Sequence, residues 1–247
     1  MQITLKHKRA LVTGGSRGIG AAIVKRLASE GVDVSFTFAN SPDRADEIVK
    51  EVKALGVRVL AIQADSAEAS AVVDAVEKTT AAFGGIDILV NNAGVLAIAP
   101  IDDLTLADFD KTIEVNLRAV FVATQAAIKH MQEGGRIINI GSTNAERMPF
   151  AGGSIYAMSK SALQGLVKGL ARDLGPRGIT INNVQPGPVA TEMNPSEGEF
   201  AEMLKKLMAL PRYGKVEEIA GMVAYLASPE AAYITGSSLM IDGGFSA

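Results

Sequence analysis

Short runs of apolar residues alternate along the chain with longer stretches in which apolar residues recur every three or four positions. The short runs are typical of strands, and the longer stretches are typical of amphipathic helices. The pattern predicts strands over residues 9–13, 32–38, 58–63, 86–90, 136–140, 180–184 and 238–241. It predicts helices over residues 18–29, 42–55, 65 to about 83, 105 to about 131, 154–174 and 216–227.

Two of these helices are preceded by residues that resemble a capping box, in which side chains satisfy free N–H groups of the first turn. Asp65 and Glu68 form an acidic variant of the pattern, and Thr105 and Asp108 form a second example. We therefore expect both helices to begin at these residues.

Strands and helices alternate over the whole chain, which predicts βαβ units with right-handed crossovers. The strands at 86–90 and 136–140 are apolar almost throughout, as in a parallel sheet buried on both faces. We expect one domain over residues 1–247: a doubly wound α/β Rossmann fold of about seven parallel strands with helices on both faces. The exception is the proline-rich segment at about 188–212, which encloses an amphipathic stretch at 200–208 and is typical of a lid over a binding site.

Composition excludes several classes of protein. Of 247 residues, 48% are hydrophobic, which argues against disorder, and 24 basic against 27 acidic residues give no basic field for nucleic acid. The chain has no cysteine and only two histidines, so we expect no disulfide, no metal site and no catalytic triad. The first twelve residues hold only a short apolar run, and no stretch is long enough for a membrane span. We expect a cytoplasmic protein without a membrane partner.

Glycines are in surplus, and several of them follow the first strand, where they open the first helix. Glycines in such a turn let the backbone approach a pyrophosphate, and the helix N-terminus supplies free N–H groups. We expect this turn to bind a dinucleotide, the alternative being a glycine-rich turn without a ligand. The residues of this site are Gly14, Ser16, Arg17, Gly18, Ile19 and Gly20. The same residues match the G-x-S-x-G nucleophile elbow, but that mechanism needs a late histidine, and His130 does not fit the required order.

The end of the second strand bears on the choice of cofactor. An acidic residue at this position would bind the ribose 2′-hydroxyl of NADH, but the chain has Asn40 and Ser41 there. Arg17 lies in the glycine turn within reach of the same corner, and a guanidinium pairs well with phosphate. We therefore expect NADPH/NADP+ as the cofactor, with a solvated surface role for Arg17 as the alternative.

A second set of residues suggests proton chemistry. Tyr156 and Lys160 are four residues apart in a predicted helix and share one face, while Ser142 follows the strand at 136–140. A nearby lysine ammonium favours the phenolate form and lowers the pKa of a tyrosine. Tyr156 can then donate a proton to a developing alkoxide while Ser142 hydrogen-bonds the carbonyl oxygen. Such a pair alone is weak evidence, since most are surface neighbours on a helix.

Together these motifs make the whole chain resemble the short-chain dehydrogenase/reductase family. The matching pieces are residues 13–20, 91–94, Asn116, Ser142, Tyr156, Lys160, 186–187 and 242–244. The resemblance implies that Tyr156 is the acid/base, that Ser142 positions the carbonyl, that Lys160 binds the nicotinamide ribose, and that Asn116 holds a water in a proton relay. It implies further cofactor-site residues at Asp65, Ser66, Asn91, Ala93, Gly94, Pro186, Gly187, Val189 and Thr191, with Asn91 supporting the sheet. The alternatives are that Asn116 kinks a helix, that Asn91 is a turn residue and that Asp65 only caps a helix.

Within the family the chain is most similar to 3-oxoacyl-carrier-protein reductases, which implies reduction of a ketone to a secondary alcohol. One departure is the acidic Glu133 where a basic patch for a carrier protein is expected. The stretches 147–149, 161–165, 178–181 and 185–188 also resemble a biofilm-dispersal subgroup thought to bind cyclic-di-GMP. A cyclic-di-GMP-binding regulator on a reductase scaffold is therefore the alternative function.

Residues near the expected site suggest a mid-sized, partly apolar ketone or alcohol as the substrate. The candidate substrate residues are Thr143, Glu146, Met148, Phe150 and Met193, together with the expected lid. Apolar residues at 200–208 either face the site or dock the lid on the body. The family resemblance also implies a homotetramer.

Overall fold

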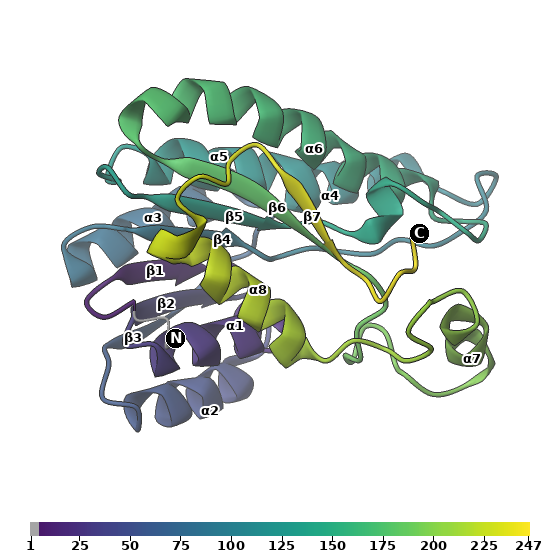
Figure 1. Ribbon diagram of the computed structural model, residues 1–247, viewed down its shortest axis with the longest axis horizontal. Coiled ribbons are helices and arrows are strands. Elements are labelled where there is room, and N and C mark those ends of the chain that lie inside the picture. The colour runs from purple at the N-terminus through teal and green to yellow at the C-terminus, as the bar shows by residue number, and fades with distance from the viewer. Residues whose placement is uncertain (1–4) are drawn as a thin grey trace.

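The computed structural model describes residues 5–247, so residues 1–4, which enter the single-domain and signal-sequence expectations, lie outside the described residues. Seven parallel strands form one sheet in the order β3-β2-β1-β4-β5-β6-β7 (Figure 1). They are β1 (Arg9–Val12), β2 (Asp33–Phe38), β3 (Val59–Gln63), β4 (Ile88–Asn91), β5 (Arg136–Ile140), β6 (Thr180–Pro186) and β7 (Ser238–Ile241). The predicted doubly wound α/β fold is confirmed.

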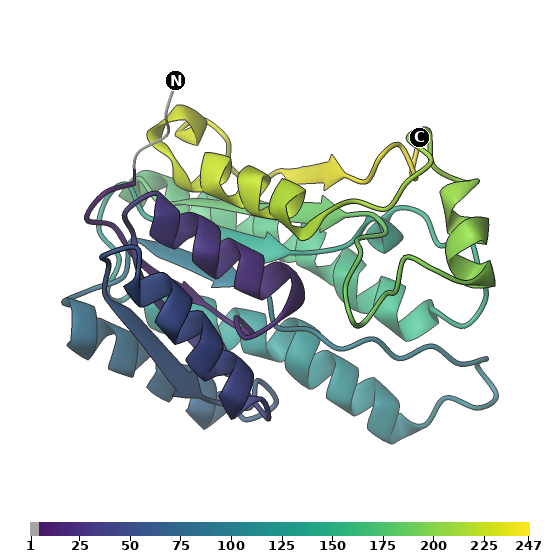
Figure 2. The same ribbon diagram turned by 90° about the horizontal axis from the view of Figure 1, so that it is seen from below.

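Helices cover both faces of the sheet (Figures 1 and 2). One layer consists of α1 (Gly18–Ser29), α2 (Pro42–Lys53) and α8 (Val216–Ala227). The other consists of α3 (Ala69–Phe83), α4 (Leu106–Ile113), α5 (Ala119–Ala127) and α6 (Ser154–Leu174). Each layer buries its apolar face in a separate core, one around Val24 and Phe36 and one around Leu89 and Val167. Among residues 5–247, no helix is both long and apolar enough to span a membrane.

One of the two predicted capping boxes is present. Thr105 Oγ1 accepts from Asp108 N at 3.1 Å, and Asp108 Oδ2 accepts from Thr105 N at 3.0 Å. The prediction for residues 65–68 is wrong, because α3 begins only at Ala69 and its N-cap residue makes no side-chain cap. Asp65 Oδ1 instead accepts from Ala67 N at 2.9 Å, so its side chain closes a local turn before the helix.

The helix predicted from 105 to about 131 is divided. A π-helix, Glu114–Arg118, separates α4 from α5, and α5 ends at Ala127. Inside the π-helix, the side chain of Asn116 forms hydrogen bonds to both backbone groups of Val95, at 2.8 and 3.0 Å. The helix is shorter than expected because the chain turns after Ala127 and buries Met131 in the core.

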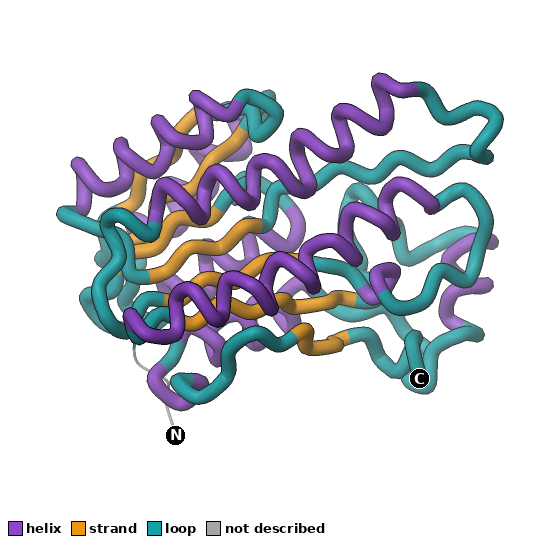
Figure 3. Tube along the Cα trace, turned by 90° about the horizontal axis from the view of Figure 1, so that it is seen from above, coloured by secondary structure: helices purple, strands orange, loops and turns teal. Residues whose placement is uncertain are grey.

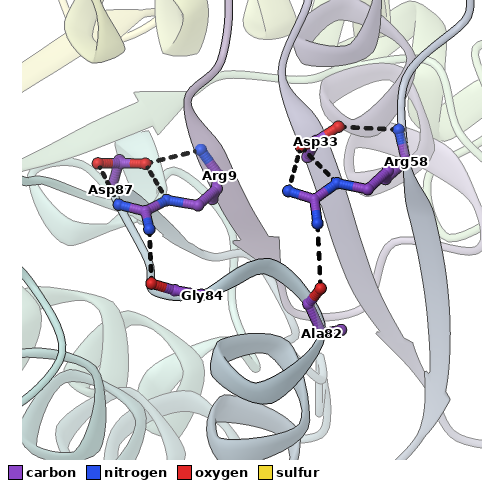
Figure 4. A network of polar contacts seen from close by, with 6 residues as sticks. All are labelled: Arg9, Asp33, Arg58, Ala82, Gly84 and Asp87. Atoms are coloured by element: carbon purple, nitrogen blue, oxygen red, sulfur yellow. Dashed lines mark hydrogen bonds and ion pairs between the residues drawn. The ribbon is translucent and has the colours of Figure 1, made fainter.

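Two arginines tie the amino ends of the strands to the end of α3 (Figure 4). Arg9 Nε lies 2.7 Å from Asp87 Oδ2, and Arg58 Nε lies 2.8 Å from Asp33 Oδ2. Each guanidinium also donates to a backbone carbonyl at the carboxyl end of α3. Burial alone raises the pKa of Asp87, but the hydrogen bonds and charge of Arg9 prevail and lower it. These pairs therefore hold the end of the sheet opposite the glycine turn.

A row of polar side chains runs from the central strand β4 to the edge strand β7 at one level of the sheet. Asn91, Asn139, Asn183 and Ser238 are register partners on β4, β5, β6 and β7. Asn91 Nδ2 donates to Asn139 Oδ1 at 2.8 Å, and Asn183 Nδ2 donates to Ser238 Oγ at 3.3 Å. The three asparagines are almost completely buried.

The segment 188–212, named the lid segment here, leaves the carboxyl end of β6 and carries the short helix α7 (Glu199–Lys205). Figure 3 shows it among the long loops at one end of the molecule, close to the C-terminal residues. Leu204 and Met208 are buried in a small separate cluster with Tyr213 and Phe245. These apolar residues therefore dock the lid segment on the body, whereas Met203 is 41% exposed.

Candidate active site

The glycine turn lies between β1 and α1, where its shape is set by close contacts. Gly14 and Gly18 have φ of +66° and +55°, which favour glycine. A β-carbon at Gly20 would lie 2.1 Å from the carbonyl oxygen of Gly14. Asn92 Nδ2 donates to the carbonyls of Thr13 and Gly14, both at 2.9 Å, and so fixes the turn to the end of β4. Asn92 was not among the predicted site residues, although it lies within the predicted motif 91–94.

The first turn of α1 suits an anion. Its N-cap residue, Arg17, makes no side-chain cap, and the first turn contains no acidic residue. The free N–H groups of a helix N-terminus and the positive end of its dipole are therefore available to a phosphate. Ser16 and Gly20 are buried in the turn, while Gly18 and Ile19 are partly exposed. These residues fit a dinucleotide pyrophosphate.

The predicted adenosine-side residues lie side by side. Phe38 and Gln63 are register partners at the carboxyl ends of β2 and β3, so the following residues are adjacent. Asn40 is exposed and Ser41 partly exposed after β2, and Asp65 is exposed and Ser66 partly exposed after β3. These four residues form the rim of the sheet at which open α/β sheets bind ligands.

Ser142, Tyr156 and Lys160 meet at the carboxyl end of β5. Ser142 follows β5 and caps a short 3-10 helix, Thr143–Ala145, while the other two lie one turn apart on α6. Lys160 Nζ lies 5.8 Å from the centroid of the Tyr156 ring. Burial raises the pKa of Tyr156, and a hydrogen bond from Ser142 only partly opposes this rise. The pKa of Tyr156 is therefore raised and not lowered as predicted from the proximity of Lys160, and the phenol stays protonated at neutral pH.

Lys160 is buried, and not all of its N–H donors have a partner. Its Nζ donates to the carbonyl oxygen of Ile140 at 2.9 Å, and a β-carbon at Gly94 would lie 3.5 Å from it. An ammonium has three N–H donors, so two remain for a ligand. This buried, incompletely paired ammonium fits a ribose diol beside Gly94. Burial lowers the pKa of Lys160 from 10.5 to about 8.

This shift predicts a pH dependence of stability. Between pH of about 8 and 10.5, the unfolded chain holds the Lys160 proton while the folded protein has lost it, so the free energy of unfolding rises with pH. Relative to Lys160→Met, the wild-type protein should gain up to about 3 kcal/mol across this window. Urea unfolding from pH 7 to pH 10.5 measures the gain. The control is Lys168→Met, at an exposed position on the same helix, which keeps Lys160 and should therefore show the pH profile of the wild-type protein. An equal pH profile for wild type and Lys160→Met would contradict the shift.

The two asparagines predicted by resemblance, Asn116 and Asn91, form hydrogen bonds to other protein groups near the site. Asn116 Nδ2 also donates to Ser159 Oγ at 3.1 Å, so both of its amide hydrogens are used. Asn116 lies in the π-helix, and a water in the predicted proton relay could bond only to its oxygen atoms, because both amide hydrogens are used. Asn91 bonds to Asn139 across the sheet, as expected of a supporting residue. Ala93 N donates to Thr13 Oγ1 at 3.1 Å, which places Ala93 against the glycine turn.

Gln185 is a second residue that the predicted site did not include. It is 1% exposed on β6, and its Nε2 donates to the carbonyl oxygen of Ser142 at 3.0 Å. Its Oε1 accepts from Gln164 Nε2 on α6 at 3.3 Å. The sequence pattern did not predict its burial, because the strand was expected to end at residue 184, whereas β6 continues to Pro186. Gln185 holds the backbone of Ser142 without facing a reacting group itself.

The residues after β6 close the other side of the site. A β-carbon at Gly187 would lie 2.7 Å from Asp242 Cα, so Pro186 and Gly187 pass directly beside the residues after β7. Val189 is buried, and a β-carbon at Gly18 would lie 3.6 Å from Thr191 Cγ2. The start of the lid segment therefore packs on the glycine turn.

The candidate substrate residues separate into two groups. Thr143 is 1% exposed and donates to Asp242 Oδ2 at 3.0 Å, so it anchors the loop. Glu146 is exposed and accepts from Gln164 Nε2 at 2.7 Å. Of the other three, Phe150 lies edge-to-face with Phe200 of the lid segment at 5.3 Å, Met193 belongs to the lid segment and is 57% exposed, and Met148 lies beside Gly153. Within residues 5–247, no group of three or more acidic or histidine side chains is placed to hold a metal ion.

Known proteins share this fold. A family model described as Enoyl-(Acyl carrier protein) reductase matches residues 14–246. The structure of a short-chain dehydrogenase/reductase from Serratia marcescens BCRC 10948 is 65% identical, with a TM-score of 0.97 over 98% of this chain and 99% of that chain. A short-chain dehydrogenase from Burkholderia cenocepacia J2315, solved in complex with NADP, is 56% identical, with a TM-score of 0.97 over the same shares.

Two relatives carry functional names. A cyclic-di-GMP-binding biofilm dispersal mediator protein of Escherichia coli K12 is 50% identical over 97% of this chain and 98% of its own length. A 3-oxoacyl-[acyl-carrier-protein] reductase of Synechocystis is 42% identical over 95% of each chain. The chain belongs to the short-chain dehydrogenase/reductase family, as its motifs indicated, and is an oxidoreductase of that family.

Proposed function

We propose that the protein is an NADPH-dependent carbonyl reductase that converts a ketone to a secondary alcohol. The observation that carries this proposal is the joint placement of Ser142, Tyr156 and Lys160 at the carboxyl end of β5, beside a glycine turn suited to a dinucleotide. The NADP complex of the Burkholderia relative supports the same cofactor.

The residues of the site divide the proton chemistry among themselves. When bound, NADPH supplies the hydride for the carbonyl carbon. Tyr156 donates its hydroxyl proton to the carbonyl oxygen, and this completes the alcohol. The Ser142 hydroxyl oxygen lies 3.1 Å from Asn144 Oδ1. The hydroxyl can rotate and hydrogen-bond the substrate carbonyl oxygen. When protonated, the Lys160 ammonium stabilises the tyrosine phenolate that remains.

The substrate proposed is a mid-sized, partly apolar ketone, such as a 3-oxoacyl compound. Met148, Phe150 and Met193 are the side chains proposed to contact it, since Thr143 is committed to Asp242 and Glu146 to Gln164. A neutral contact set suits a ketone better than a carboxylic acid, because it supplies no cation to pair with a carboxylate.

Consumption of NADPH with a panel of activated ketones and β-keto esters tests this function. We expect turnover of at least one member and a preference for NADPH over NADH of about tenfold or more in kcat/KM, the size of one charged hydrogen bond. No turnover across the panel would contradict the reductase proposal. Equal use of NADH would contradict the cofactor proposal alone.

A second function, cyclic-di-GMP binding, is favoured by the name of the Escherichia coli relative. Two residues behind this resemblance, Gln164 and Gln185, are occupied in holding the Ser142 loop, which favours the reductase. Calorimetry with cyclic-di-GMP distinguishes the two. Absence of binding at tens of micromolar would exclude the regulator.

The proposed assembly is a homotetramer. An apolar groove between α4–α5 and α6 supports it, with Phe121 being 46% exposed there. The groove is lined in part by Ile113, Leu117, Phe121, Leu166 and Leu170. Sedimentation velocity tests the assembly, and a monomer at micromolar concentration would contradict it. Location in the cytoplasm stays a prediction.

A further inference from the structure

One carboxylate of the lid segment lies between two arginines that come from other parts of the chain. Glu192 Oε1 lies 2.6 Å from Arg44 Nη1, and Glu192 Oε2 lies 3.9 Å from Arg17 Nη1. Arg17 precedes α1, Arg44 is in the first turn of α2, and Glu192 follows β6. Three connections at the same edge of the sheet thus meet at one point.

This point lies beyond the carboxyl end of β2, since Arg44 is in the first turn of the helix that follows that strand. In this fold the ribose lies beyond the end of β2, where an acidic residue binds the 2′-hydroxyl. Here the connection from β2 to α2 contains no acidic residue, and Arg44 follows it by three residues. The only carboxylate that an ion pair brings to these two arginines, among residues 5–247, comes from the lid segment.

The charges show which ligand would displace Glu192. Two guanidiniums and one carboxylate leave a net charge of about +1, whereas a phosphate dianion in place of the carboxylate would be matched by both arginines. All three side chains are more than half exposed, and exposed ion pairs contribute little to stability. Arginine binds phosphate through two parallel hydrogen bonds, which are stronger than a single exposed pair. A 2′-phosphate would therefore replace Glu192 readily.

We propose that Arg44, together with Arg17, forms the binding site for the 2′-phosphate, and that Glu192 is a displaceable counter-ion in that site. This inference rests on the proposed NADPH specificity and adds a second phosphate ligand to it. Glu192 lies between Thr191, which packs near Gly18, and Met193. Its release by the phosphate frees the start of the lid segment from the two arginines and so links cofactor binding to the position of the lid.

Calorimetry with 2′,5′-ADP and 5′-AMP tests the proposal, because these probes differ only in the 2′-phosphate and need no turnover. Arg44→Ala should weaken binding of 2′,5′-ADP by about tenfold or more and change binding of 5′-AMP by less than twofold. Arg17→Ala should act in the same direction. Arg172→Ala, at an exposed position near the end of α6, is the control and should leave both ligands unaffected.

Glu192 has the opposite expected effect. Glu192→Gln should strengthen binding of 2′,5′-ADP by about three- to tenfold, because it removes the competing charge, and this gain should vanish in the Arg44→Ala background. Glu199→Gln, in the first turn of α7, is the matched control.

The outcomes separate this proposal from the cofactor assignment. If wild type binds 2′,5′-ADP no better than 5′-AMP, the NADPH assignment itself fails. If wild type prefers 2′,5′-ADP and Arg44→Ala keeps that preference, only the inference about Arg44 fails. If Glu192→Gln leaves or lowers the affinity for 2′,5′-ADP, Glu192 does not compete for the site.

Discussion

Replacing Tyr156 by Phe should lower kcat for ketone reduction by about 100- to 10,000-fold, the usual contribution of a positioned proton donor. The phenyl ring preserves the packing on α6 and removes only the hydroxyl that faces Ser142. The binding of NADPH should change by less than about threefold, since the turn before α1 is untouched. Steady-state kinetics and a fluorescence titration with NADPH measure the two effects separately.

The matched control for this variant is Tyr233→Phe, which removes a hydroxyl from a fully exposed tyrosine and should retain wild-type kcat. If Tyr156→Phe kept more than about a tenth of kcat, a different group would be the proton donor. Parallel loss of NADPH binding would instead show that the ring holds the cofactor site together.

Gly20→Ala should lower the melting temperature and weaken NADPH binding by about tenfold or more. A methyl group at this position would lie 2.1 Å from the carbonyl oxygen of Gly14 and 2.5 Å from Asn92 Nδ2, so the turn must move. Overpacking of this kind costs about 1–3 kcal/mol, which corresponds to a fall of about 2 to 12 °C in a domain of this size. Thermal unfolding and the NADPH titration report on the two effects.

A glycine elsewhere in a helix gives the control for this substitution. At Gly221, in α8, the nearest atom to an added β-carbon is the flexible end of Arg26 at 3.6 Å. Gly221→Ala should therefore keep or raise the melting temperature, since alanine is the better helix former by about 1 kcal/mol. A Gly20→Ala protein that melted and bound NADPH like wild type would show that the turn tolerates a side chain.

The hydrophobic pattern was sufficient for the architecture, because strands buried on both faces and helices with one apolar face leave distinct periodicities. The glycine turn and the pair Tyr156–Lys160 were predictable for a similar reason, since their spacing is local. Asn116 shows what a local sequence pattern cannot predict. Its π-helix depends on hydrogen bonds to Val95, 21 residues away, and no local pattern records such a partner.

Local sequence patterns also fail to predict part of the proposed adenosine-binding end of the site. Arg17 was found because it lies within a motif, but Arg44 lies on a helix whose surface carries many charges. Only the fold brings it to Glu192. Asp65 shows the converse error, because a side chain that suits a helix cap made a turn instead. Gln185 lies one residue beyond the strand predicted at 180–184, and only the longer β6 places its side chain among buried residues.

The polar row on β4, β5, β6 and β7 has a consequence for how the sheet assembles. Parallel strands with nearly uniform apolar sequences offer several alignments of similar energy, since Ile137 and Ile138 differ little as neighbours. Displacing β5 by one residue against β4 would set Asn91 opposite an isoleucine and turn Asn139 toward the other face, where both amides would lose their partners. The asparagines therefore specify the register of the strands. They destabilise misaligned sheets during folding more than they stabilise the correct one. Because amides do not ionise, this discrimination is the same at every physiological pH.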